Sequence, residues 1–208
     1  MKTQGKLIRE FFWMMFLAAL LACCGRASAQ VLPEYSAFPS SSLGVQLSTQ
    51  GLGLQGSYSF AKVFNARVGF NSMFGTWQYN NRDVTFNRNS IYAIADWQPK
   101  YGGSTWFQRK WFVSAGVAYY FNNSVFRQGT TNLPDYTIYM AKLRPYIGTG
   151  LGNIRLTDKL GLRLDMGYYI PLTSPTSTNP EKADKVSSGF RGLLPGLNAG
   201  ATFYIKFK

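Results

Sequence analysis

"GLNAGATFYIKFK", Gly196–Lys208, ends the 208-residue chain, and from Leu197 to Phe207 every second residue is apolar. The residues between them, from Asn198 to Lys206, are small, polar or tyrosine. An alternation of period two gives a β-strand two unlike faces. The ending therefore predicts a final strand with one apolar face, and the question is whether other segments repeat it.

The same alternation returns five times earlier in the chain. It occupies Phe64–Phe74, Ser90–Gln98, Phe112–Asn123, Ala141–Gly150 and Gly161–Pro171. Each segment has an apolar face and a small or polar face, and no stretch has a convincing helical period. The sequence therefore predicts an all-β fold.

The stretch from residue 43 to residue 60 changes phase. Its apolar residues hold odd positions up to Leu47 and even positions from Leu52. Either a tight turn at Gln50 and Gly51 separates two strands, or a glycine bulge shifts one long strand. The turn gives eight strands and the bulge seven. Single-chain bacterial barrels have even strand numbers, with longer loops outside the cell, which favours eight strands and a turn on the outer side.

The first 29 residues have the form of a secretory signal peptide. A basic head precedes the apolar run "FFWMMFLAALLACC", which is shorter than the ~20 residues of a membrane-spanning helix. We expect cleavage between Ala29 and Gln30. "LLAC", ending at Cys23, offers the alternative of a lipidated N-terminus. The predicted division is 1–29 signal peptide, 30–42 N-terminal segment and 43–208 barrel.

Composition separates the possible partners. Charged residues make up 15% of the chain and aromatics 16%, with 21 glycines and a net charge of +13. Removing residues 1–29 takes away four basic residues and one acid, leaving +10. The basic residues are scattered singly and the chain is predicted to be exported, so we expect no nucleic-acid partner. Anionic lipid headgroups or lipopolysaccharide phosphates suit this charge better.

The two faces indicate which side of the sheet meets lipid. A soluble eight-stranded carrier is apolar inside and densely charged outside. Here the polar face holds Gly, Ser, Asn, Thr and Tyr, which suits a narrow lumen. The prediction is thus a transmembrane antiparallel up-and-down β-barrel with its apolar face in lipid. The predicted lipid-interface aromatics, near the strand ends, are Phe64, Trp97, Tyr119, Phe121, Phe203 and Phe207.

These features resemble the small outer-membrane β-barrel proteins of Gram-negative bacteria, similar in size to OmpX and the OmpA membrane domain. The resemblance rests on the signal peptide, on "RPYIGTGLG" and "LRLDMGYYIP", and on the aromatic-rich last strand. It implies an outer-membrane location and folding by the barrel-assembly machinery. One departure is that Lys208 follows Phe207, whereas many such proteins end on the aromatic residue.

The lumen face also carries charge. Its predicted polar cluster is Arg67, Asp96, Lys142, Arg144, Arg163 and Asp165. The chain has no histidine, which the enzymes of this membrane class use as a base, so we expect no enzyme activity. We expect the cluster's charges to neutralise one another, because unpaired buried charge is costly.

The sequence offers no cofactor or metal site. "GTGLGN" and "GLGLQG" imitate a nucleotide-binding glycine motif, but that motif needs a following helix, and a strand is predicted instead. We expect these glycines to thin the lumen. With neither histidine nor clustered carboxylates, the pattern predicts no bound metal.

The architecture leaves three functions open. The leading hypothesis is a non-enzymatic barrel that supports the cell envelope or contacts surfaces through its outer loops. The alternatives are a narrow porin-like pore for small solutes and a subunit of a larger outer-membrane complex. The loop at residues 172–191, rich in Ser, Thr, Pro and Lys, is the predicted partner-contact segment.

Overall fold

The computed structural model describes residues 36–78, 81–129, 134–179 and 196–207. All of them belong to one unit, Leu32–Lys208. The predicted signal peptide, its cleavage site and Cys23 lie outside the described residues. The elements are β1 Ser41–Ser48, β2 Gly51–Ala61, β3 Phe64–Gln78, β4 Asp83–Trp97, α2 Trp106–Lys110, β5 Trp111–Arg127, β6 Tyr136–Tyr139, β7 Leu143–Arg155, β8 Leu160–Tyr169, β9 Thr176–Ser177 and β10 Leu197–Phe207.

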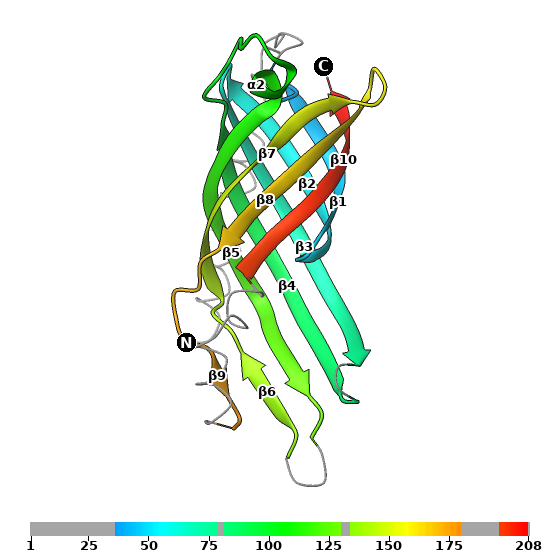
Figure 1. Ribbon diagram of the computed structural model, residues 1–208, viewed down its shortest axis with the longest axis vertical. Helices are drawn as coiled ribbons and strands as arrows, with labels where there is room; N and C mark the ends of the chain where they lie inside the picture. Colours follow the sequence, from blue (N-terminus) through cyan, green and yellow to red (C-terminus); the bar gives the residue numbers. More distant parts are fainter. Residues whose placement is uncertain (1–35, 79–80, 130–133, 180–195, 208) are drawn as a thin grey trace, which may run out of the picture. The chain divides into compact units, whose positions relative to one another are not determined.

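Eight of these strands form a closed antiparallel barrel (Figure 1). β1, β2, β3, β4, β5, β7, β8 and β10 pair in that order, and pairing of β1 with β10 completes the circle. Each strand is antiparallel to both neighbours. The prediction of an eight-stranded up-and-down barrel is confirmed.

The phase change near residue 50 is a tight turn. Thr49 and Gln50 connect β1 to β2, and Ser48 pairs with Gly51 across the two strands. Gly51 has a φ of 111°, in a region that L side chains rarely adopt. A Cβ there would lie 2.2 Å from the Ser72 backbone oxygen. The turn therefore requires glycine at this position, and the two-strand interpretation holds.

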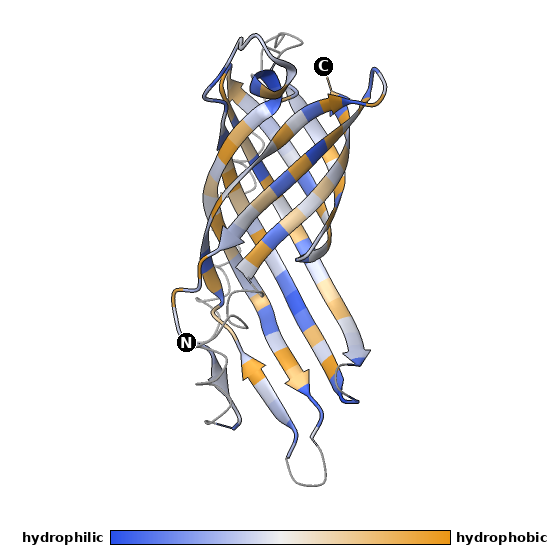
Figure 2. Cartoon of the chain, in the orientation of Figure 1, coloured by the Kyte–Doolittle hydropathy of each residue, from blue (hydrophilic) through white to orange (hydrophobic). Residues whose placement is uncertain are grey.

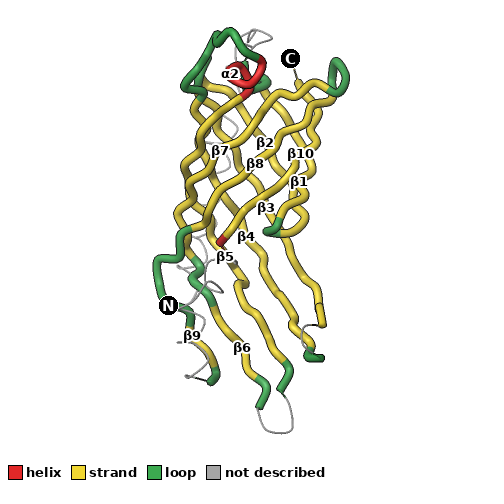
Figure 3. The backbone as a smooth tube through the Cα atoms, in the orientation of Figure 1, coloured by secondary structure: helices red, strands yellow, loops and turns green. Residues whose placement is uncertain are grey.

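The two ends of the barrel differ in their connections (Figure 3). The connections 62–63, 98–110 and 156–159 share one end with the start of β1 and the end of β10. The opposite end holds the 49–50 turn and the long β8–β10 connection. Because barrels of this kind keep short turns in the periplasm, we call these the periplasmic end and the outer end.

Several strands are longer than the alternation predicts. β4 begins at Asp83 rather than Ser90, and β5 continues to Arg127. Together with β3, β6 and β9 they form a sheet that extends past the barrel wall at the outer end (Figure 1). Outside the wall nothing demands one apolar and one polar face, so the period-two signal fades there.

The short helix α2 was also not predicted. It is one turn long, and Thr105 caps it: Gln108 N donates to Thr105 Oγ1 at 3.3 Å, and Thr105 N donates to Gln108 Oε1 at 3.5 Å. A single turn is too short to produce a helical period in the sequence. Among the described residues, no helix is long and apolar enough to cross a membrane.

The barrel is apolar outside and polar inside, and Figure 2 shows hydrophobic and hydrophilic residues following one another along the strands of its wall. In β1 the side chains of Leu43, Val45 and Leu47 are more than half exposed, whereas Gln46 is 2% exposed. Of the described buried residues, more are polar or charged than hydrophobic. A soluble protein has the reverse arrangement. The outer wall therefore suits lipid, as the alternation predicts.

The predicted interface aromatics all lie on the exposed face of the wall. Phe64 pairs with Trp97 across β3 and β4 at the periplasmic end, and Phe207 ends β10. Tyr119 and Phe121 make an edge-on contact nearer the outer end, with ring centroids 5.5 Å apart. Their position at a lipid interface stays a prediction.

Glycines on the lumen face make room for tyrosines. Gly69 pairs with Tyr92, and a Cβ on Gly69 would lie 2.4 Å from the Tyr92 hydroxyl oxygen. Gly148 pairs with Gly167, and a Cβ on either would lie 2.4 Å from the Tyr146 hydroxyl oxygen. Tyrosines thus lie over glycines on the inner wall. The segment "GTGLGN" lies within β7, and the element that follows is the strand β8 rather than a helix.

Gly167→Val should destabilise the barrel by about 1–3 kcal/mol, because the new side chain would overlap Tyr146 and the Ile147 carbonyl oxygen. Gly56→Val is the matched control, since no atom lies within 4 Å of a Cβ at Gly56. The measurement is the temperature at which the folded band is lost when samples are heated before gel migration. An equal drop for both variants would contradict this packing role.

Candidate functional site

Four charged side chains from three strands meet inside the barrel. Arg67 comes from β3, Asp96 from β4, and Arg163 and Asp165 from β8. Each side chain is at most 5% exposed. Their strands turn these positions inward, opposite the lipid-facing residues on either side. We call these four residues the ion-pair ring.

Each arginine of the ring contacts both carboxylates. Arg67 Nε lies 3.0 Å from Asp96 Oδ2, and Arg67 Nη1 lies 3.1 Å from Asp165 Oδ1. Arg163 Nη2 lies 2.9 Å from Asp96 Oδ2, and Arg163 Nε lies 3.1 Å from Asp165 Oδ1. The four charges alternate in sign and sum to zero.

Neutral side chains complete the coordination of the ring. Ser114 Oγ donates to Asp96 Oδ1 at 2.7 Å, and Asn65 Nδ2 donates to Asp96 Oδ2 at 2.8 Å. Arg67 Nη1 also donates to Gln55 Oε1 at 3.2 Å. Buried charges are tolerated when they are paired and their remaining lone pairs and protons are bonded. This arrangement meets both conditions for Asp96.

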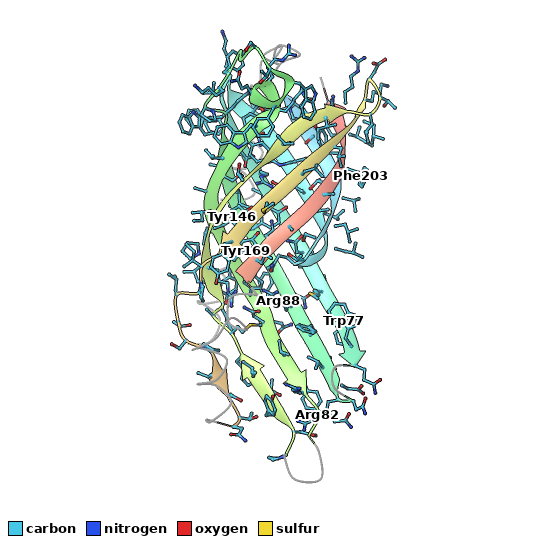
Figure 4. All side chains as sticks on the ribbon, viewed as in Figure 1. Trp77, Arg82, Arg88, Tyr146, Tyr169 and Phe203 are labelled. Atoms are coloured by element: carbon cyan, nitrogen blue, oxygen red, sulfur yellow. The ribbon has the colours of Figure 1, made fainter. Side chains whose placement is uncertain are left out.

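Aromatic rings lie next to the charged groups. The Phe112 ring centre is 4.0 Å from the guanidinium carbon of Arg163. Elsewhere in the lumen, Tyr146 and Tyr169 have ring centroids 4.6 Å apart, and Tyr169 contacts Tyr120 edge-on at 6.2 Å. Figure 4 shows Tyr146 and Tyr169 within the barrel. The lumen is therefore filled by side chains, as expected for a barrel of eight strands.

A second pair of arginines lies nearer the outer end. The guanidinium carbons of Arg88 and Arg144 are 5.2 and 5.6 Å from the Tyr120 ring centre. Arg88 Nε donates to Asn123 Oδ1 at 3.0 Å, and Arg144 Nε donates to the Ala141 carbonyl at 3.2 Å. Arg88 was not among the predicted lumen residues, because it lies before the segment whose alternation is clear.

Two members of the predicted polar cluster are not in the ion-pair ring. Arg144 is buried, but it lies far from the ring along β7. Asp165 of the ring pairs with Gly150, which is six residues after Arg144, and at ~3.3 Å per residue this separation is about 20 Å. Lys142 is exposed, because it precedes the first residue of β7 and is not held to the inward face. Arg144 therefore faces the lumen as predicted but lies outside the ring, whereas the expectation that Lys142 faces the lumen is wrong.

Residues Ser36–Ser40, which we call the N-terminal strap, cover the periplasmic end of the lumen. Ala37 N donates to Gln98 Oε1 at 3.0 Å, and Ser59 Oγ donates to the Pro39 carbonyl at 2.6 Å. The Phe38 ring is 1% exposed and packs on Phe112 with centroids 5.7 Å apart. The strap is thus connected through Phe112 to the ion-pair ring.

A local irregularity in β7 receives the strap. The register of β7 against β8 shifts between Leu151 and Ile154, and within this shift Asn153 Nδ2 donates to the Ser36 carbonyl at 2.9 Å. A Cβ on Gly152 would lie 2.1 Å from the Ala37 carbonyl oxygen. The strap was not predicted, although a glycine inside a strand, here Gly152, is a recognised sign of a bulge or a close backbone approach.

The described ranges contain no group of three or more His, Cys, Asp or Glu residues that could hold a metal ion.

No family model matches the chain, and a search of curated proteins finds no match. Among solved structures, CarO of Acinetobacter baumannii is 15% identical with a TM-score of 0.60, covering 82% of this chain and 98% of its own. CarO2 of the same species is 16% identical with a TM-score of 0.57, covering 81% and 98%.

The chain has the fold of a small outer-membrane β-barrel. The closed eight-stranded wall, its apolar exterior and this likeness agree on that point. At such low identity the likeness concerns the fold alone.

Asp96→Asn should lower the free energy of unfolding of this outer-membrane barrel by about 3–5 kcal/mol, because it leaves the ring with an uncompensated positive charge. Adding Arg163→Gln should recover part of the loss by restoring neutrality. Urea unfolding of the protein in lipid vesicles, monitored by tryptophan fluorescence, measures the free energy of unfolding of the single and the double variant.

Asp158→Asn is the control for this comparison, because Asp158 forms an exposed ion pair with Arg155 and its loss should have little effect. If the losses from Asp96→Asn and Arg163→Gln simply add in the double variant, the coupling within the ring is refuted.

Proposed function

We propose that this chain is a non-enzymatic, non-conducting barrel of the bacterial outer membrane that supports the envelope and contacts other surfaces through its outer end. The observation that carries the proposal is the filled lumen. The strap, the ion-pair ring and the tyrosines occupy its interior at successive levels. A role in the membrane wall and at its surface requires no passage through the lumen.

The ion-pair ring supports a structural role rather than catalysis. The side chains of Asp96 and Asp165 are 0–1% exposed, and each is held by both arginines of the ring. A catalytic carboxylate must reach a substrate within hydrogen-bond distance. Carboxylates enclosed in this way are suited to joining strands across the lumen.

The filled lumen also argues against the porin-like alternative. In the ring, Arg67 from β3 meets Asp165 from β8, and this ion pair spans the lumen. At the periplasmic end the strap adds backbone and the Phe38 ring. A solute would have to displace buried ion pairs and packed aromatic rings to pass.

The outer end supports the surface-contact part of the proposal. The extended sheet of β3, β4, β5, β6 and β9 carries exposed aromatic side chains, with Phe74 79% and Trp77 58% exposed. Figure 4 labels Trp77 and Arg82 on this extension. The predicted contact segment 172–191 lies mostly outside the described residues and stays a prediction.

Export by residues 1–29, assembly by the barrel-assembly machinery and contact with lipopolysaccharide belong to the same proposal.

Purified full-length protein should produce no channel openings above background in planar lipid bilayers, because its lumen is filled. The preparation must first show the heat-dependent gel shift of a folded barrel, so that an absence of channel openings cannot be caused by unfolded protein. Steady, ohmic conductance steps from the shifted protein, absent from boiled protein, would refute the non-conducting proposal and favour the pore.

A further inference from the structure

We propose that the periplasmic end of the barrel is a docking surface for anionic phospholipid headgroups, formed by a basic rim and an aromatic anchor. The proposal rests on the proposed membrane placement and deepens it by naming the lipid class and the end of the barrel that binds it. Phosphatidylglycerol is the probe with which it can be tested.

The described charges are distributed unequally between the two ends. The periplasmic end carries the basic rim: Lys62, Lys100, Arg109, Lys110, Arg155, Lys159 and Lys206. Asp158 is the one described acidic residue there, and it pairs with Arg155. At the outer end, counting the buried Arg88 and Arg144, the described basic residues Arg82, Arg88, Arg127, Lys142 and Arg144 stand against Asp83 and Asp135, an excess of three positive charges compared with six at the periplasmic end. The field at the periplasmic end therefore attracts anions.

The helix α2 joins this basic rim to the lipid-facing wall. Trp111, at the start of β5, donates from Nε1 to Thr149 Oγ1 of β7 at 2.7 Å. The Phe107 ring stacks on Trp111, with centroids 6.5 Å apart and planes inclined by 15°. Trp111 and Thr149 occupy the same outward phase as the lipid-facing residues of β5 and β7. The helix therefore lies against the lipid-facing side of the wall, at the periplasmic end, rather than over the lumen.

The exposed residues of α2 match the chemistry of a membrane interface. Trp106 is 52% and Phe107 54% exposed, while Arg109 and Lys110 form the helix's last turn. Aromatic rings prefer the headgroup level, and adjacent basic side chains reach phosphate groups from there. Lys62 and Lys100 are exposed in neighbouring connections and can extend their charged ends in the same way.

The position of the rim separates phospholipid from lipopolysaccharide as the partner. Lipopolysaccharide would meet the outer end, where the described excess of positive charge is half that of the periplasmic end and no counterpart of α2 is described. An anionic phospholipid in the periplasmic leaflet would meet the basic rim and α2 together. Because attraction to anionic headgroups acts within about one Debye length, which is about 10 Å in 0.1 M salt, it should weaken as salt is added.

The test is the selectivity of the folded protein for spin-labelled phosphatidylglycerol over spin-labelled phosphatidylcholine in phosphatidylcholine vesicles. Electron spin resonance measures the fraction of each label immobilised at the protein surface. The rim variant is Lys62→Gln, Lys100→Gln and Lys159→Gln combined. The matched control, which removes three charges from the opposite end, is Arg82→Gln, Arg127→Gln and Lys142→Gln combined.

We expect the wild-type protein to prefer phosphatidylglycerol at least about threefold at low salt, and 0.5 M NaCl should reduce that preference. The rim variant should lose most of it and the outer-end control should keep it. A Trp106→Ser, Phe107→Ser variant should also weaken the preference by loosening α2 from the interface.

Equal selectivity in the wild-type protein and rim variant, or an equal loss in rim variant and control, would overturn the proposal. A heat-dependent gel shift on the same vesicles reports whether the barrel is folded and inserted. Its absence, or channel conductance, would instead count against the proposed function, so the two failures are distinguishable.

Discussion

Backbone hydrogen bonding in lipid is the constraint on which the rest of this structure depends. No water is present in the hydrocarbon core to satisfy an unpaired backbone group, so a sheet that spans it must close. Here closure comes from the pairing of β1 with β10 and of β4 with β5. Closing with eight strands leaves a narrow interior, which accounts for the inward glycines beneath Tyr92 and Tyr146.

A narrow polar interior creates an electrostatic problem that the ion-pair ring solves. Arg67, Asp96, Arg163 and Asp165 are nearly fully buried, and any one of them alone would be costly. Arranged with alternating sign, they satisfy one another and connect β3, β4 and β8 across the lumen. Such a ring specifies one registry of these strands, because a shift of one residue would turn a charged side chain into lipid.

The sequence was informative about which face of the sheet a residue occupies, and much less so about the level of that residue along the barrel. Alternation assigned Arg67, Asp96, Arg163 and Asp165 to the lumen, and the parity of strand numbers favoured the turn after β1. The alternation could not show that Arg144 lies about 20 Å along β7 from the residue that pairs with Asp165, because a period of two carries no information on the stagger between strands. Stagger is set by the pairing of distant segments, which a single sequence does not reveal.

The features that alternation missed all lie where the wall ends. The strap enters the lumen from before β1, α2 folds against the outside of the wall, and the extended sheet continues beyond the outer end. None of these elements has lipid on one side and a lumen on the other, so none inherits the period of the wall. A filled barrel offers little freedom for functional variation within its wall, since each inward residue packs against another strand. The two ends are free of this packing constraint, and there the basic rim and the extended sheet present different chemistry.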